Sequence, residues 1–157
     1  MVELVLPNDA NTMGNVLGGR VLHWIDLAAA IVAHRHCRTE AVTASMDEVS
    51  FLAPIRVGQI AVISACMTFV GRTSMEIRVD VQSEDLMSGE RRGTSTAYLT
   101  FVAVDKNGRP ADVPPLLLET EEEKREAGAA EARRAARLKS RPYGATHSAT
   151  PREIEQR

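Results

Sequence analysis

The chain of 157 residues is long enough for one domain with a hydrophobic core, and 44% of its residues are hydrophobic. Its formal net charge of −2 gives no general attraction to nucleic acid or to acidic membranes. No apolar run reaches the roughly 18 residues of a membrane span, so we expect a cytoplasmic protein without nucleic-acid or membrane partners.

A polar, glycine-containing segment leads into the first predicted helix. Residues 2–6 alternate weakly, as a short strand does, and turn-forming residues dominate the following segment up to Gly19. The helix is predicted from about residue 19 to 36, because apolar residues recur on one broad face: Val21, Leu22, Ile25, Ala28, Ala29, Val32 and Ala33. The small alanines of this face favour close packing against a sheet.

One carboxylate, Asp26, interrupts this apolar helix. Its neighbours one turn away are Leu22, Ala29 and Ala30, so the helix itself supplies no basic partner. Burying an unpaired carboxylate is costly, which indicates either a catalytic role or pairing with an arginine from elsewhere in the fold. The pair Gly18-Gly19 at the helix start can offer bare backbone N–H groups to an anionic centre.

Four strands are predicted after the helix, over residues 41–52, 59–71, 72–84 and 91–104. The third alternates cleanly from Met75, with Ile77 facing the core and Glu76 facing outward. A helix packed on one face of an antiparallel sheet is an α+β fold. Because one helix covers little of such a sheet, we also expect oligomerisation.

The C-terminal region differs in composition from the rest of the chain. Residues 119–140 are predicted to form a charged helix, acidic at its start and basic at its end, which suits the helix dipole. The helix has little apolar stripe, so we interpret it as solvated or partner-contacting. Residues 141–157 are polar and are predicted to be disordered. The predicted divisions are therefore residues 1–118, 119–140 and 141–157.

Several blocks of the sequence resemble the acyl-CoA thioester hydrolases of the hotdog superfamily, in the cytosolic and brain acyl-CoA hydrolase branch with its single-domain bacterial relatives. They follow the family's order over about residues 3–118 and include Pro7-Asn8-Asp9-Ala10-Asn11, Gly14-Asn15-Val16-Leu17-Gly18-Gly19, Trp24-Ile25-Asp26-Leu27-Ala28-Ala29, Val42-Thr43-Ala44-Ser45, Phe51-Leu52-Ala53-Pro54-Ile55-Arg56-Val57-Gly58 and Val70-Gly71-Arg72-Thr73-Ser74-Met75. The resemblance implies a hotdog fold, a curved antiparallel sheet around one central helix. It also implies homodimers paired edge to edge, often assembled into hexamers as trimers of dimers.

The resemblance further implies hydrolysis of acyl-CoA to free acid and CoA at sites shared by two subunits. By the family's motif, Asn15 of one subunit faces Asp26 of the other, although Asn15 by itself is also typical of a turn. Asp26 acts as general base on water or attacks directly to form an anhydride, while Asn15 orients the water or the carbonyl. Backbone N–H groups at Gly18 or Gly19 supply the oxyanion site, and no cofactor is expected beyond the CoA of the substrate.

Basic residues are the candidates for binding the phosphates of CoA. In similar proteins the loop with Arg72, Thr73 and Ser74 lies near the CoA pyrophosphate or pantetheine, although an ordinary polar turn explains it as well. Arg56 is a weaker candidate. No metal is predicted, because the spacing of His34, His36 and Cys37 with His23 fits no standard zinc pattern.

Two other functions on the same fold are less consistent with the sequence. Hotdog enoyl-CoA hydratases usually carry a histidine five residues after the aspartate, and this chain has Ile31 there. A non-catalytic acyl-CoA sensor does not need the Asn15 and Asp26 pair that this chain retains.

Overall fold

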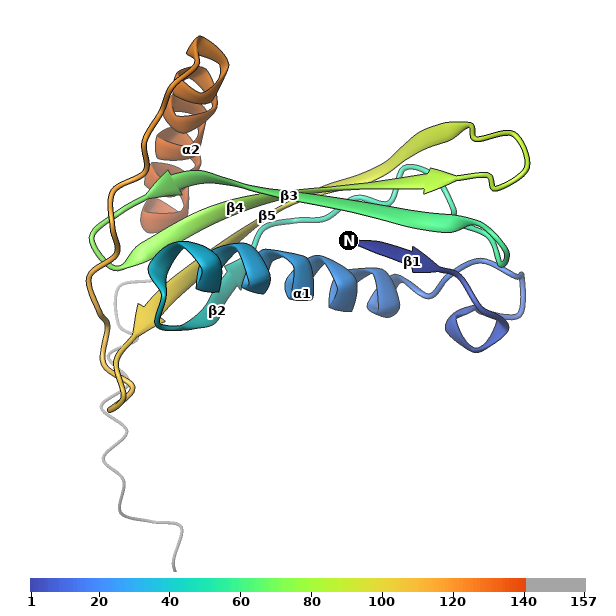
Figure 1. Cartoon of the computed structure of the whole chain (residues 1–157), viewed down its shortest axis with the longest axis horizontal. Coiled ribbons are helices and arrows are strands. Elements are labelled where there is room, and N and C mark those ends of the chain that lie inside the picture. The colour runs from blue at the N-terminus through green and yellow to red at the C-terminus, as the bar shows by residue number, and fades with distance from the viewer. Residues whose placement is uncertain (141–157) are drawn as a thin grey trace, which may run out of the picture.

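The computed structural model describes residues 1–140, so the predicted disordered tail lies outside the described residues. One antiparallel sheet has the strand order β1-β3-β4-β5-β2 and curves around a long helix (Figure 1). The strands are β1 (Val2–Leu4), β2 (Glu40–Met46), β3 (Ile60–Val70), β4 (Ser74–Glu84) and β5 (Arg91–Val104). The helices are η1 (Pro7–Asp9), α1 (Gly18–Cys37) and α2 (Glu121–Ser140).

The core lies between α1 and the concave face of the sheet. The helix buries its small and branched apolar residues, and the alternating residues of β4 and β5 meet it from the sheet: Met75, Ile77, Val79, Val81, Ala97, Leu99, Phe101 and Ala103. This arrangement confirms the predicted hotdog fold, and it also confirms the alternation of residues predicted from Met75 onward. Arg38, in the left-handed conformation, ends the helix.

The strand predicted over residues 41–52 is too long. β2 ends at Met46. The next residue, Asp47, donates its backbone N–H to the carbonyl of Tyr98. The chain then leaves the sheet edge and returns through the Leu52 N–H, which donates to the carbonyl of Thr94. The β-branched and aromatic residues that suggested a strand here instead pack in an irregular segment, with Val49 against the core.

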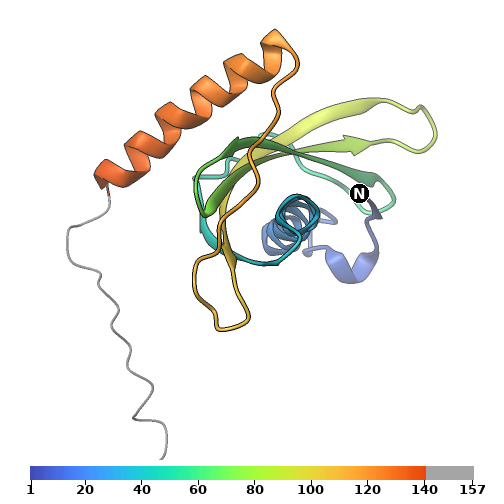
Figure 2. The ribbon, with the colours of Figure 1, turned by 60° about the vertical axis from the view of Figure 1, so that its left-hand side comes forward.

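The charged C-terminal helix exposes most of its residues to solvent, but one of its faces docks against the sheet. α2 lies on the outer face of the sheet, opposite α1 (Figure 2). One small residue of α2, Ala130, is fully buried in this contact. On the sheet, Glu76 of β4 faces outward as predicted, yet it is only 2% exposed because the helix covers it.

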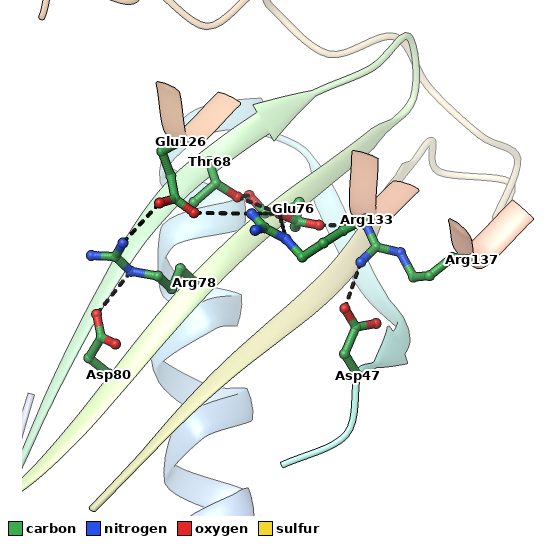
Figure 3. A network of polar contacts seen from close by, with 8 residues as sticks. All are labelled: Asp47, Thr68, Glu76, Arg78, Asp80, Glu126, Arg133 and Arg137. Carbon is green, nitrogen blue, oxygen red and sulfur yellow. Dashed lines mark hydrogen bonds and ion pairs between the residues drawn. The ribbon is translucent and has the colours of Figure 1, made fainter. Parts of the chain in front are cut away.

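Ion pairs hold α2 against the sheet (Figure 3). Arg133 donates to Glu76 Oε1 at 2.8 Å, and Arg137 donates to Glu76 Oε2 at 2.6 Å. Thr68 of β3 adds a hydrogen bond to Oε1 at 2.8 Å, and the guanidinium of Arg133 also stacks over the Tyr98 ring. The many charges and few large apolar residues of α2, which indicate a solvated helix in the sequence, here include the side chains that dock the helix on the sheet.

Glu76 makes the docking of α2 dependent on pH. Burial alone would raise the pKa of this carboxyl, but hydrogen bonds from Arg133, Arg137 and Thr68 outweigh burial and hold the pKa below its ordinary value of 4.5. Its stabilising effect is therefore complete above about pH 4.5 and disappears as the pH falls through the lowered folded-state pKa.

We expect the free energy of unfolding of wild type to exceed that of Glu76→Gln by a constant amount from neutral pH to about pH 4.5. Below that the gap should shrink, because protonation removes the charge that the two arginines bind. Chemical denaturation at a series of pH values measures it, with Glu131→Gln on the exposed face of α2 as the matched control. A gap that widens in acid would contradict the role given to Glu76.

Candidate active site

The loop before α1 is fixed by the buried carboxylate of Asp9. Its Oδ1 pairs with Nε of Arg20 at 2.8 Å, and its Oδ2 accepts the backbone N–H of Leu6 at 3.1 Å. The carbonyl of Asp9 accepts the N–H of Leu17. These contacts tie both ends of the loop to the first turn of α1, although the sequence did not single out Asp9 or Arg20.

The first turn of α1 has unpaired N–H groups. Leu17 stands at the N-cap position, and its side chain makes no capping hydrogen bond. Within residues 1–140, the N–H groups of Gly18 and Gly19 have no hydrogen-bond partner, as is usual for the first residues of a helix. No atom lies within 4 Å of a Cβ built at Gly19. The predicted anion-stabilising amides are therefore open to a ligand.

Asn11 in the same loop has a fixed side chain. Its Oδ1 accepts the backbone N–H groups of Met13 at 3.0 Å and Asn15 at 3.2 Å. Because both bonds are made by the oxygen, the Nδ2 group remains as an exposed donor, with no partner among the described residues. Such an anchored amide can bind a carbonyl oxygen or a water molecule.

Asp26 lies at the open edge of the sheet. It is half-buried, and its Oδ1 accepts a hydrogen bond from Oγ1 of Thr43 at 2.8 Å. Thr43 belongs to β2, an edge strand that pairs only with β5 in the described chain. No arginine or other cation pairs with Asp26 in residues 1–140, so the alternative of a structural ion pair is not supported. The sequence alone does not single out Thr43 as a site residue.

An apolar cavity adjoins the start of α1. Its volume is about 230 Å³, and its lining includes Asn15, Gly18, Phe51, Ile55 and Thr94. Asn15 therefore lies beside the predicted oxyanion amides, and its side chain makes no hydrogen bond to the described residues. The cavity offers a place for an apolar group next to the helix N-terminus.

One protomer does not bring the two halves of the predicted site together. Asp26 lies eight residues along α1 from Gly18, which is roughly 12 Å at about 1.5 Å per residue. An oxyanion donor must lie within about 3 Å of the carbonyl oxygen, and a base that acts through one water lies about two hydrogen-bond lengths from the carbonyl carbon. The separation of Asp26 from the Gly18-Gly19 amides along one helix therefore favours a site that takes these groups from two chains.

The candidate CoA-binding residues are also at two different ends of the molecule. Arg56 pairs through its backbone with Asn15, at the start of α1. Thr73, beside Arg72, accepts the N–H of Ala103 near the end of α1. Arg72 itself pairs with Asp112 at 3.2 Å, and its side chain is 82% exposed. A single chain thus offers basic groups at both ends of the helix.

If Arg72 binds a CoA phosphate, as the resemblance implies, Arg72→Ala should raise KM for an acyl-CoA about 10-fold with little change in kcat, because a charge-assisted hydrogen bond is lost. Steady-state kinetics measure both constants. Asp112→Asn breaks the same ion pair without removing the cation, so it should leave KM unchanged. An unaltered KM in Arg72→Ala would remove this loop from the CoA site.

Three of the candidate metal-binding residues instead bond backbone carbonyls. His34 bonds the carbonyl of Ala30, His36 bonds the carbonyl of Pro114, and Cys37 bonds the carbonyl of Thr39. Burial raises the pKa of the Cys66 thiol, which disfavours the reactive thiolate. The described residues contain no group of three or more His, Cys, Asp or Glu side chains placed to hold a metal ion. Neither helix long enough to be considered, α1 or α2, is apolar enough to cross a membrane.

Comparisons with known proteins identify the family of this chain. The model of the thioesterase superfamily matches residues 13–90. A Bacillus subtilis protein named YkhA, an uncharacterized acyl-CoA thioester hydrolase, is 49% identical over 119 residues, which are 76% of this chain and 69% of that protein. This chain belongs to the thioesterase superfamily. The predicted resemblance is thereby confirmed.

Solved structures of family members have the same fold. An apo-hexameric acyl-CoA thioesterase is 45% identical, with a TM-score of 0.85 over 88% of this chain and 89% of that chain. The acyl-CoA hydrolase of Staphylococcus aureus, solved with butyryl coenzyme A and coenzyme A, is 36% identical, with a TM-score of 0.80 over 89% and 88%. The mammalian relatives named cytosolic acyl coenzyme A thioester hydrolases are longer, and this thioesterase-superfamily chain spans 33% of their length.

Proposed function

We propose that the chain hydrolyses acyl-CoA thioesters to a free acid and CoA, at sites shared between two copies. The observation that carries the proposal is the separation of the two catalytic elements within one protomer. Asp26, without a cation partner, lies at an unpaired sheet edge, and the open N–H groups of Gly18 and Gly19 lie about 12 Å away along α1. A second copy across the edge completes the site.

Variants of the Staphylococcus aureus enzyme support a set of three working residues. Its structures include alanine variants of one asparagine, one aspartate and one threonine, and that asparagine precedes the aspartate by 15 residues while the threonine follows it by 17. In this chain Asn11 precedes Asp26 by 15 residues, and Thr43 follows Asp26 by 17. Asn15, favoured by the motif alone, does not have this spacing.

The free side-chain donor of Asn11 also favours Asn11 over Asn15 as the working asparagine. Its Nδ2 group is available because backbone N–H groups bind its oxygen. We assign to Asn11 the binding of the thioester carbonyl or of the attacking water. Asn15, which lines the apolar cavity, then contacts the acyl group or the adjacent thioester.

Asp26 acts as the general base in the proposed reaction. Thr43 fixes Oδ1, which leaves Oδ2 to take a proton from water. The resulting hydroxide attacks the carbonyl carbon, and the electron pair of the C=O bond moves to oxygen, where the helix N–H groups stabilise it. Collapse of this intermediate breaks the C–S bond, and the CoA thiolate takes the proton from Asp26. The alternative is direct attack by Asp26 on the carbonyl carbon with an anhydride intermediate, and the free Oδ2 oxygen is available for that step as well.

The open edge of β2 is the proposed contact between copies. Unpaired edge strands invite another strand, and the exposed Val42 and Thr43 offer a β-branched surface for it. We expect pairing of β2 with its counterpart about a two-fold axis to bring Asp26 of one copy near the loop and helix start of the other. Relatives described as hexameric support a further assembly of such dimers into a hexamer. The cytosolic name of the mammalian relatives supports a cytoplasmic location.

A thiol-release assay over a series of acyl-CoA chain lengths tests the activity, run beside an enoyl-CoA hydration assay. We expect release of free CoA from saturated acyl-CoA and no hydration of enoyl-CoA. Binding of acyl-CoA without thiol release would favour the sensor, and hydration without release would favour the hydratase.

A further inference from the structure

Arg137 of α2 connects two strands that are not neighbours in the sheet. Its Nη2 donates to Glu76 of β4 at 2.6 Å, and its Nη1 donates to Asp47 at 2.7 Å (Figure 3). Asp47 directly follows the last residue of β2. Between them lies β5, on which Thr100 pairs with both Glu76 and Ser45. One guanidinium therefore spans three strands and holds the end of the edge strand.

The strand that Arg137 holds is irregular next to Thr43. The register between β2 and β5 shifts between Thr43 and Ser45, so Ala44 is an extra residue at that point. Such bulges bend a strand and change the direction of neighbouring side chains. The direction of the Thr43 hydroxyl toward Asp26 thus depends on how the segment beyond the bulge is held.

Packing alone does not hold this segment against α2. A cavity of about 150 Å³ separates the helix from the strand, lined by Ala44, Ser45, Glu76, Thr100 and Arg137 among others. Oγ1 of Thr100 has no hydrogen-bond partner in the described structure. Besides its ladder with β5, the strand end is held by the ion pair of Asp47 with Arg137 and by the backbone hydrogen bond from Asp47 to Tyr98.

We propose that Arg137 is a positioning residue for catalysis: through Asp47 it fixes the end of β2 and so aims the Thr43 hydroxyl at Asp26. The inference rests on the proposed function, because it acts through the Thr43–Asp26 contact. It gives the C-terminal helix, which lies beyond the matched family region of residues 13–90, a role in the reaction.

The test is a double-mutant cycle on kcat and KM with an acyl-CoA that wild type hydrolyses. Asp47→Asn is the main variant, because it loosens β2 while Glu76 keeps both arginines and α2 stays docked. We expect Asp47→Asn and Arg137→Gln each to lower kcat about 10-fold, since a small misplacement of a catalytic group has such an effect. KM and the thermal midpoint of Asp47→Asn should change little. Arg125→Gln, an exposed change on α2, is the matched control and should behave as wild type.

The cycle separates positioning from general stability. In a Thr43→Ala background, Asp47→Asn should lower kcat by less than about twofold more, because the group it positions is already absent. Losses that multiply in the double variant, or an unchanged kcat in Asp47→Asn, would overturn the positioning role and leave the proposed function intact. If Thr43→Ala itself left kcat unchanged, the proposed role of Thr43 would fail, and the positioning role with it.

Discussion

Asp26→Asn should lower kcat for acyl-CoA hydrolysis about 10³-fold, because the amide cannot accept the proton of the attacking water. The substitution keeps the size of the side chain, and the amide oxygen can still accept the hydrogen bond from Thr43. Binding of substrate should therefore change little, so the loss appears in kcat and not in KM. Thiol release at saturating acyl-CoA measures it directly.

The control for Asp26→Asn is a carboxylate far from the site. Glu131→Gln changes an exposed residue of α2 by the same loss of charge and should retain full activity. The unfolding midpoint and the oligomeric mass of Asp26→Asn should match those of wild type, because no ion pair of the described chain involves Asp26. A variant that keeps more than about a tenth of wild-type kcat would exclude Asp26 as base or nucleophile.

Asn11→Ala should lower kcat about 10²-fold, which is typical for the loss of one donor to a developing oxyanion. Alanine also removes the acceptor of two loop N–H groups, so a second variant is needed. Asn11→Asp keeps an oxygen for those N–H groups but lacks the Nδ2 donor. We expect Asn11→Asp to lose about as much activity as Asn11→Ala while the loop keeps its stability.

Asn15→Ala is the comparison for Asn11. If Asn15 lines the acyl cavity, its replacement changes KM for longer acyl chains more than kcat. A large loss of kcat in Asn15→Ala with an unaffected Asn11→Ala would favour the residue that the sequence motif indicates. Kinetics of both variants over short and long acyl-CoA substrates separate the two.

Much of the fold could be predicted from the sequence because its periodicity is strong. The alternation after Met75 and the apolar face of α1 each identify an element that has one face in the core. The end of β2 could not be predicted in this way. Val49 and Phe51 have the residue types of a strand, but they lie in an irregular segment after the chain leaves the edge at Asp47, where Val49 packs against the core and Phe51 is half exposed.

The docking of α2 could not be predicted, because a charged helix and a polar sheet face each have the pattern of solvent exposure. Glu76 alternates with core residues, so the sequence predicts that it faces outward. Only the three-dimensional structure brings Arg133 and Arg137 from more than fifty residues away to cover it. Ionic docking of this kind leaves no apolar stripe in the sequence.

In the candidate site, too, some residues could be predicted from the sequence and others could not. Asp26 could be found from the sequence, because a lone carboxylate in an apolar helix is unusual. Thr43 could not, since a threonine in a predicted strand is ordinary, and its contact with Asp26 depends on the pairing of β2 with β5. Asn11 and Asn15 occupy the same turn-rich loop, so residue type alone does not distinguish them, whereas the hydrogen bonds of Asn11 do.

The most direct test of a shared site is complementation between two inactive chains. Asp26→Asn and Asn11→Ala subunits, each nearly inactive alone, are mixed or co-expressed in equal amounts and assayed for thiol release. If each site takes Asp26 from one copy and Asn11 from the other, half of the random dimers contain one intact site, and about a quarter of wild-type activity returns. An Asp26→Asn and Thr43→Ala mixture should not recover, because those residues lie in one protomer. No recovery in the first mixture, despite exchange of subunits, would contradict the shared site.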